Sequence, residues 1–202
     1  MRDKPVTVVR LAAVNVGTPT LVGELHGEGV WSGIRKHPVA PDTRLWLSWL
    51  DLAGDGQADL DVHGGPDKAV YAYPSEHYAF WQDARQHAGL GRINDSLPPG
   101  SLGENLTLTG LLETGVWAGD VLKFAHCELR VTLPREPCYK FNASIGFARA
   151  SKMMAQSGFC GFYLAVETPG ALRAGESFEL IAGRRSVSIP QLFAAKMAKH
   201  LR

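Results

Sequence analysis

The sequence has little cysteine, no excess of either charge and no long apolar run. Three of its 202 residues are cysteine: Cys127, Cys138 and Cys160. Their odd number and their spacing fit neither a disulfide framework nor paired zinc ligands. Lysine and arginine together number 21, against 20 aspartate and glutamate residues, for a net charge of +1. A near-neutral chain has no global attraction to nucleic acid or to an anionic membrane, so any cationic site must be local.

Targeting and membrane signals are also lacking. The first five residues lead into an alternating segment rather than into the apolar stretch and small-residue cleavage site of a signal peptide. No uncharged apolar run approaches the roughly 20 residues that a helix needs to span a bilayer. We therefore expect a cytoplasmic protein without a membrane partner. A chain of 202 residues with 45% hydrophobic residues indicates one large globular domain.

Short strands dominate the predicted secondary structure. Apolar patterns predict strands within residues 6–14, 21–22, 45–47, 106–108, 121–124, 129–133, 162–166 and 178–181. Helices are predicted over about 75–88 and 147–156, with a short amphipathic helix from Pro190 onward. Strands interrupted by isolated helices argue against a doubly wound sheet. The expected fold is mainly β with inserted helices: a closed β-barrel domain over residues 1–185 and a short C-terminal helix within 186–202.

The most informative segment, residues 133–142, carries Cys138 at the end of a predicted strand. Its two prolines hold the backbone extended and outside a strand ladder, so we expect the cysteine on a rigid loop. Arg135 and Lys140 place positive charge near the thiol and favour the thiolate, which is the form that acts as a nucleophile or as a soft-metal ligand. The alternative is a buried, inert cysteine. The flanking charges and prolines favour a functional role.

Three other segments carry polar side chains that suit an anionic ligand or its support. His63 and Lys68 bracket a Gly-Gly pair whose backbone amides can face a phosphate or another oxyanion, although a plain turn between strands is the alternative. Lys36 belongs to a cationic cluster at residues 35–37, which is either an anion contact or a solvated loop. Glu104 and Asn105 stand at the entrance of a strand, where they either brace a turn or support a neighbouring site.

Signals for other cofactors are missing. The Gly-Gly segment has neither the helix nor the glycine spacing of a nucleotide-binding loop. The cysteines do not form an iron–sulfur set. His126 and Cys127 lack a second pair at zinc-finger spacing, so Cys127 and Cys160 are assigned to packing or to the surface.

Taken together, these segments resemble the MOSC family, the molybdenum-cofactor sulfurase C-terminal domain proteins, and most closely its small bacterial YiiM-type members. The resemblance rests on the order and spacing of residues 34–39, 54–59, 63–69, 73–78, 103–106, 119–120 and 134–142. It implies a pyruvate-kinase-like β-barrel that binds the molybdenum cofactor, molybdopterin, with Cys138 as the catalytic residue and the protein ligand to molybdenum. At the level of the family only, it also implies pyridoxal phosphate binding.

The resemblance further implies which residues hold the cofactor. Residues that would bind the pterin and its phosphate are Arg135, Lys140, Asn142, His63, Lys68 and Lys36, while Glu104 and Asn105 would shape the pocket. The close relatives carry a three-helix C-terminal extension, of which residues 186–202 would be a remnant.

An activity follows from the same resemblance. YiiM-type members are similar to enzymes that reduce N-hydroxylated compounds, including hydroxylaminopurine base analogues, to amines, which is a detoxification. The expected partners are such a small-molecule substrate and a separate electron-donating reductase, with the protein as a monomer or homodimer. Two alternatives stay open: a non-catalytic carrier that holds cofactor or persulfide sulfur on Cys138, and a cofactor-free enzyme with Cys138 as nucleophile and His63 as its base.

Overall fold

The computed structural model describes residues 9–25, 28–56, 64–91 and 95–200. Its strands are β1 (Arg10–Val16), β2 (Thr20–Leu25), β3 (Glu28–Ser32), β4 (His37–Pro38), β5 (Leu45–Leu47), β6 (Val70–Pro74), β7 (Leu106–Thr109), β8 (Val121–Lys123), β9 (Glu128–Pro134), β10 (Phe162–Thr168), β11 (Gly170–Leu172) and β12 (Glu179–Ile181). Its helices are η1 (Pro66–Lys68), η2 (Ser75–His77), α2 (Tyr78–His87), η3 (Glu113–Gly115), α3 (Tyr139–Ile145), α4 (Ala150–Ser157) and α5 (Ile189–His200).

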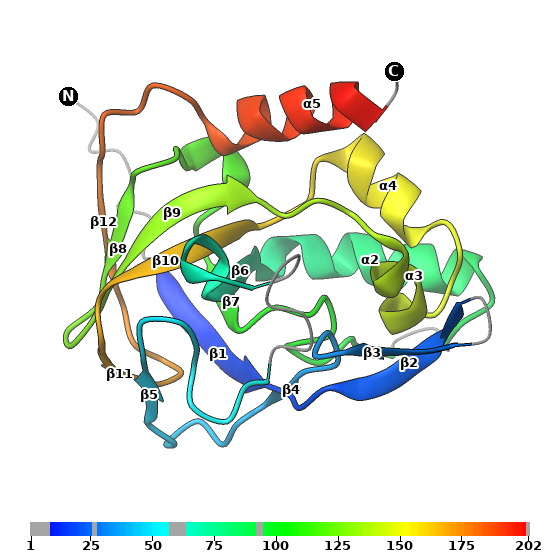
Figure 1. The fold of residues 1–202 in the computed structure, drawn as a ribbon, viewed down its shortest axis with the longest axis horizontal. Helices are drawn as coiled ribbons and strands as arrows, with labels where there is room; N and C mark the ends of the chain where they lie inside the picture. The colour runs from blue at the N-terminus through cyan, green and yellow to red at the C-terminus, as the bar shows by residue number, and fades with distance from the viewer. Residues whose placement is uncertain (1–8, 26–27, 57–63, 92–94, 201–202) are drawn as a thin grey trace.

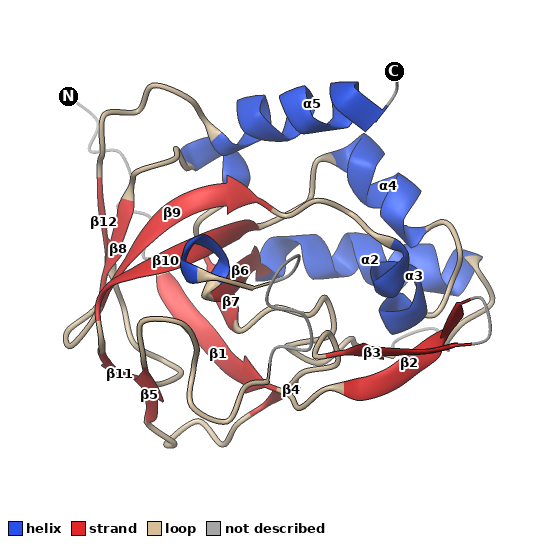
Figure 2. Ribbon diagram, viewed as in Figure 1, coloured by secondary structure: helices blue, strands red, loops and turns tan. Residues whose placement is uncertain are grey.

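A curved eight-stranded sheet forms the main body of the protein. Its strand order is β12-β8-β9-β10-β6-β7-β1-β4. Every pairing in it is antiparallel except that of β6 with β7. Figure 1 shows this sheet on one side of the molecule, α2, α3 and α4 gathered on the other, and α5 along the top. Figure 2 shows the same division between strands and helices, which confirms the mainly-β class with inserted helices.

The described ladder does not close continuously into the predicted barrel. Its edge strands are β12 and β4, and no pairing between these two is present among the described residues. The sheet nevertheless curls far enough for the segment before β12 to reach β1. Leu11 donates its N–H to the Glu176 carbonyl at 2.9 Å, and Gly175 donates to the Leu11 carbonyl at 2.7 Å. These bonds join two regions that lie near opposite ends of the strand order.

The central strand β6 is buried at all five of its positions. A strand covered on both faces carries no apolar–polar alternation, so the sequence pattern does not predict it. Next to it, the fully buried Trp81 of α2 packs edge-on against Phe141 of α3, with ring centroids 5.1 Å apart. Its indole N–H donates to the Tyr73 hydroxyl at 2.6 Å. Trp81 therefore ties α2 to both β6 and α3.

The helix predicted over residues 147–156 is one of two short helices in this region. The first, α3, ends at Ile145 and is followed by Gly146, whose φ of 95° is a left-handed conformation that favours glycine. The second, α4, is capped by a residue of α3: Ser151 donates its backbone N–H to the Asn142 side-chain oxygen at 2.7 Å. Local spacing predicts α4, but the shorter α3 is missed because only a single turn of apolar residues marks it.

The C-terminal helix α5 begins with a capping box. Ser188 donates its N–H to the Gln191 side-chain oxygen at 2.9 Å, and Gln191 donates its N–H to the Ser188 hydroxyl at 3.3 Å. The helix then buries Ile189 and Phe193 and packs against β9 and η3. Within the described ranges, no helix combines the length and the apolar character that a membrane span requires.

We expect two tryptophan substitutions to separate core packing from surface exposure. Trp81→Ala should lower the free energy of unfolding by about 3–5 kcal/mol, because it leaves a cavity in the core. Trp46→Ala is the matched control: this side chain on β5 is 59% exposed, so the change should stay within about 0.5 kcal/mol. Urea unfolding followed by circular dichroism measures both. Equal losses would contradict the placement of Trp81.

Candidate functional site

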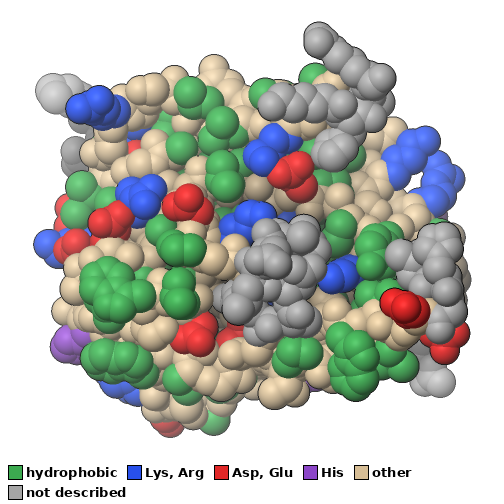
Figure 3. Space-filling view, in the orientation of Figure 1, with side chains coloured by type: hydrophobic (Ala, Val, Ile, Leu, Met, Phe, Trp, Pro, Cys, Tyr) green, Lys and Arg blue, Asp and Glu red, His purple; other side chains and the backbone are tan. Residues whose placement is uncertain are grey.

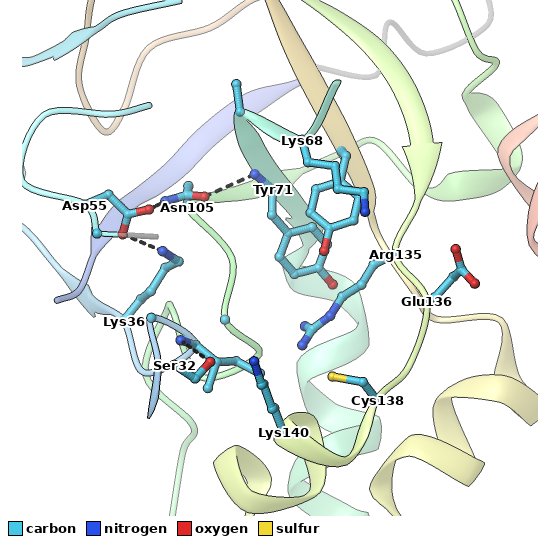
Figure 4. Close-up of a pocket in the computed structure, with 16 residues that line it drawn as sticks. Ser32, Lys36, Asp55, Lys68, Tyr71, Asn105, Arg135, Glu136, Cys138 and Lys140 are labelled. Carbon is cyan, nitrogen blue, oxygen red and sulfur yellow. Dashed lines mark hydrogen bonds and ion pairs between the residues drawn. The ribbon is translucent and has the colours of Figure 1, made fainter. Parts of the chain in front are cut away.

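A cavity lies where β6, the end of β9, and β10 meet η1, the first turn of α3 and the segment that follows β3 (Figure 4). Its lining contains four cationic side chains, two carboxylates and one thiol. The lining residues are Ser32, Gly33, Ile34, Lys36, Asp55, Gly56, Lys68, Ala69, Tyr71, Gly103, Asn105, Arg135, Glu136, Cys138, Lys140 and Tyr163.

Arg135 is the most enclosed of the cations, with 5% of its surface exposed. Its guanidinium carbon lies 4.9 Å from the ring centroid of Tyr71 and 4.9 Å from that of Phe141. One guanidinium N–H donates to the Leu102 carbonyl. A planar cation between two aromatic rings, with a hydrogen bond to a backbone carbonyl, has a fixed orientation. Arg135 therefore presents its charge to the cavity from a rigid position.

Cys138 is the residue immediately before α3, and its backbone is extended, with φ −139° and ψ 168°. The predicted rigid loop therefore leads directly into a helix. Figure 4 shows the half-buried sulfur pointing into the same space as the Arg135 guanidinium and the Lys140 side chain. Because Lys140 belongs to the first turn of α3, the helix fixes the thiol and this ammonium group relative to each other.

Lys36, Asp55 and Asn105 form a polar network on the opposite wall. The Lys36 ammonium forms an ion pair with the Asp55 carboxylate, and the two side chains are 7% and 4% exposed. The other carboxylate oxygen of Asp55 accepts a hydrogen bond from the Asn105 amide at 2.8 Å. The Asn105 side-chain oxygen in turn accepts from the Tyr71 backbone N–H at 3.1 Å. This network joins the wall to β6.

A close approach of two backbone segments fixes the spacing of that wall. A Cβ atom on Gly33 would lie 2.2 Å from the Gly56 carbonyl oxygen, well inside van der Waals contact. Only glycine therefore fits at this position without a shift of the backbone. The contact holds the segment that leads to Lys36 against the segment that carries Asp55.

The upper wall is formed by η1 and β10. Lys68, the last residue of η1, places its ammonium nitrogen 5.9 Å from the ring centroid of Tyr163. The Thr132 hydroxyl fastens η1 to β9, because it donates to the Asp67 carbonyl at 2.6 Å. Gly65, just before η1, has a φ of 90° that favours glycine. The tight Gly-Gly turn thus brings Lys68 to the cavity.

The surroundings shift the pKa of Arg135 and that of Lys36 in opposite directions. Burial opposes the charge of Arg135, but attraction to Tyr71, Tyr163 and Cys138 outweighs it and raises the pKa of the guanidinium above its ordinary value. Burial lowers the pKa of Lys36, an effect that its carboxylate partner only partly offsets. Figure 3 shows charges of both signs interspersed over this face of the molecule. The concentration of positive charge is therefore a property of the cavity.

A family model described as the MOSC domain matches residues 59–179, which is more than half of the chain. The chain belongs to the MOSC family. Among curated relatives, the uncharacterized protein YflK of Bacillus subtilis is 35% identical over 189 residues, covering 93% of this chain and 80% of YflK. Protein YiiM of Escherichia coli is 35% identical over 178 residues, covering 88% of this chain and 75% of YiiM.

A third relative is much longer than this MOSC protein. A protein of Gibberella moniliformis named reductase is 31% identical over 160 residues, covering 79% of this chain but 27% of the reductase. Solved structures show the same relationship. YiiM from Geobacillus stearothermophilus has a TM-score of 0.73 at 28% identity, covering 96% of this chain and 86% of that one. YiiM from Escherichia coli has a TM-score of 0.66 at 28% identity, covering 92% and 77%.

Six of the residues predicted for the site of this MOSC protein line one cavity, although they come from four separate segments of the chain. They are Lys36, Lys68, Asn105, Arg135, Cys138 and Lys140. His63 lies outside the described residues. The binding roles of these residues stay predictions.

Glu104 and Asn142 lie outside the cavity lining. The buried carboxylate of Glu104 accepts hydrogen bonds from the Gly100 N–H at 2.8 Å, the Leu102 N–H at 3.1 Å, the Thr107 hydroxyl at 2.8 Å and the Tyr78 hydroxyl. Glu104 therefore braces the turn, one of its two expected roles, while a role in shaping the pocket stays a prediction. Burial raises the pKa of Glu104 above its ordinary value, and the hydrogen bond from Tyr78 partly opposes that rise.

Asn142 also has a structural task. Its side-chain oxygen caps α4, as described above, and Asn142 is not among the residues that line the cavity. A role of Asn142 in cofactor binding stays a prediction.

Sequence reasoning missed several lining residues: Ser32, Asp55, Tyr71, Glu136 and Tyr163. Asp55 lies within a segment quoted for the resemblance, yet nothing in its local pattern separates a carboxylate that pairs with a buried lysine from one that faces solvent. Tyr71 belongs to β6, a strand that the sequence pattern does not predict, and Tyr163 lies in a predicted strand without a local sign of a site. Only the tertiary fold brings them to the cavity.

The other two cysteines are buried, so of the two roles expected for them, packing or surface, the structure shows packing. Burial raises the pKa of the Cys127 thiol to about 12 and that of the Cys160 thiol further still. Both groups are therefore protonated and shielded at neutral pH. Cys138 is half-buried and opens on the cavity.

We expect iodoacetamide to label Cys138 selectively in the native protein near pH 8, because the thiolate is the reacting form and the other two thiols are shielded. Mass spectrometry of peptides locates the label. Cys138→Ser should abolish labelling of the native protein, and Cys127 and Cys160 should react only after denaturation. Early labelling of Cys160 would contradict this assignment.

A second prediction concerns the buried carboxylate. Glu104→Ala should lower the free energy of unfolding by about 2–4 kcal/mol, because it leaves the buried N–H groups of Gly100 and Leu102 without an acceptor. Glu24→Ala removes a carboxylate from an exposed position on β2 and should change stability by less than about 0.5 kcal/mol. Chemical unfolding measures both. A similar effect for the two variants would show that the Glu104 network is not stabilising.

Proposed function

We propose that the protein is a molybdenum-cofactor-dependent reductase that converts N-hydroxylated compounds, including hydroxylaminopurine-type base analogues, to amines, with Cys138 as the ligand to molybdenum. The observation that carries this proposal is the convergence of one accessible thiol with four cationic side chains in one cavity. Membership of the MOSC family supports the choice of cofactor, and the relative named reductase supports the choice of reaction class.

The residues present fit the cofactor. Within the described parts of the chain, no three histidine, cysteine, aspartate or glutamate side chains are grouped so as to hold a metal ion. A lone thiolate suits a metal whose remaining ligands come from an organic group, such as the dithiolene sulfur atoms of molybdopterin. Molybdopterin also carries an anionic phosphate, and fixed cations favour such a group in a partly buried cavity.

The thiol and the cations of the cavity would have different roles in binding the cofactor. Cys138 would bind the metal, and Arg135, held rigidly beside it, would stabilise the negative charge of the thiolate. Lys140 and Lys68 would hold the phosphate from opposite walls of the cavity. Lys36 is already paired with a carboxylate, so it would contribute chiefly by keeping its wall in place.

The reaction consumes two electrons and two protons: the N–O bond breaks, the nitrogen becomes an amine and the oxygen leaves as water. When bound, the cofactor supplies the two-electron exchange with the N–O bond. The protein positions the substrate and limits access of water through Tyr71 and Tyr163, whose rings pack 5.3 Å apart at the wall. A separate reductase is proposed as the electron donor.

The decisive experiment compares Cys138→Ser with the wild-type protein, both made in a host with the complete cofactor pathway. The variant should lose at least about tenfold in molybdenum content, because even the loss of a group that only supports a metal ligand costs 10–100-fold in affinity. Its free energy of unfolding should change by less than about 1 kcal/mol, since a half-buried thiol contributes little core area. Metal and pterin analysis measures retention, with Cys127→Ala as the control that keeps the cofactor.

Turnover completes the test. The loaded wild-type protein, supplied with a chemical electron donor, should convert a hydroxylaminopurine to its aminopurine, and chromatography detects the product. Normal molybdenum in Cys138→Ser would refute the ligand assignment. Stoichiometric cofactor without turnover would favour the carrier alternative over the enzyme.

A further inference from the structure

The segment that carries the site residues, 135–138, belongs to no strand or helix in the described structure. Pro137 within this segment and Pro134 immediately before it both lack a backbone N–H donor. Its position is therefore set to a large degree by its side chains. Figure 4 shows the Arg135 guanidinium and the Cys138 sulfur on one side of this segment and the Glu136 carboxylate on the other.

The two sides of the segment have different anchors. On the cavity side, Arg135 donates to the Leu102 carbonyl and lies between two aromatic rings. On the other side, the carboxylate of Glu136, a residue that also lines the cavity, forms an ion pair with the Lys196 ammonium of α5. These two charged side chains are 40% and 28% exposed. This second anchor therefore comes from a helix about 60 residues away in the sequence.

The helix that carries Lys196 is itself firmly placed. Its N-terminus is fixed by the Ser188–Gln191 capping box and by the Ile189 N–H, which donates to the Val116 carbonyl at 3.0 Å. Buried Phe193 then holds the helix against the body of the protein. Lys196 lies three positions further, so one helical turn separates the apolar contact from the ion pair. A rigid support on this side can restrain the segment it touches.

We propose that α5 is a clamp on the site and that Lys196 is its positioning residue, which acts through Glu136 to hold the Arg135–Cys138 segment and the Cys138 thiol in place. The consequence for catalysis rests on the proposed function, whereas the positioning itself does not. An isolated exposed ion pair contributes little to global stability. The effect of the clamp is therefore expected in the reactivity of Cys138 rather than in the unfolding transition.

Alkylation of Cys138 tests the clamp without any cofactor. The full-length protein is made in a host that lacks the cofactor pathway and is treated with iodoacetamide at one fixed pH. Peptide mass spectrometry then gives separate rates for the three cysteines. Lys196→Met and Glu136→Gln should each accelerate alkylation of Cys138 about two- to fivefold, because releasing the segment opens access to a half-buried thiol.

Combined variants show whether the two residues act through each other. The double variant Lys196→Met/Glu136→Gln should react no faster than either single variant. Exchange of the charges, Lys196→Glu/Glu136→Lys, should bring the rate back toward the wild-type value, as should the conservative Lys196→Arg. Lys152→Met, which removes an exposed lysine from α4, is the matched control and should leave the rate unchanged.

Three results of these experiments would overturn the proposed clamp. Wild-type rates in the single variants, or independent effects that multiply in the double variant, would overturn it. Labelling of buried Cys127 and Cys160 in parallel with Cys138 would also overturn it, since that result indicates general loosening. A protein that never retains molybdenum would refute the proposed function and leave these alkylation results unaffected.

Discussion

A guanidinium group buried at the base of a cavity needs partners on every side, and much of the site follows from supplying them to Arg135. Burying an unpaired charge is costly, so the fold must bring compensating groups to it. The partners are the Leu102 carbonyl, the Tyr71 ring on β6 and the Phe141 ring on α3. These groups come from three separate parts of the chain. The site can therefore form only when the sheet, the 100–104 turn and α3 are already together.

The partner from the 100–104 turn depends on a second buried charge. Glu104 accepts a hydrogen bond from the Leu102 N–H and so holds Leu102 in place. The carbonyl group of the same Leu102 accepts the hydrogen bond from Arg135. The same carboxylate accepts the Tyr78 hydroxyl at the start of α2. A continuous chain of contacts thus runs from the helical side of the molecule to the cavity. Glu104 contributes to the site through this chain, although it does not line the cavity.

Sequence reasoning succeeded where the determining residues are close together in the chain. Segment 133–142 identified Arg135, Cys138 and Lys140 because its prolines and charges are contiguous, and the structure places all three at one cavity. The sequence pattern does not predict β6, because both faces of this strand are buried and its residues therefore show no apolar–polar alternation. It missed Tyr163 and Asp55 because their roles depend on strands and loops far away in the sequence. The resemblance to a family supplied Lys36 and Lys68, for which local chemistry alone left a solvated loop or a plain turn as good alternatives.

The contact of Gly33 with the Gly56 carbonyl has a consequence for engineering of the site. On that wall, the separation of the two loops is set by main chain against main chain, with no side chain between them that could be trimmed. Substitutions of side chains there would leave this separation of the two loops unchanged. On the opposite wall the spacing depends on two side chains, Lys68 and Tyr163. To fit larger or smaller ligands, the cavity would therefore be widened or narrowed by substitutions on η1 and β10.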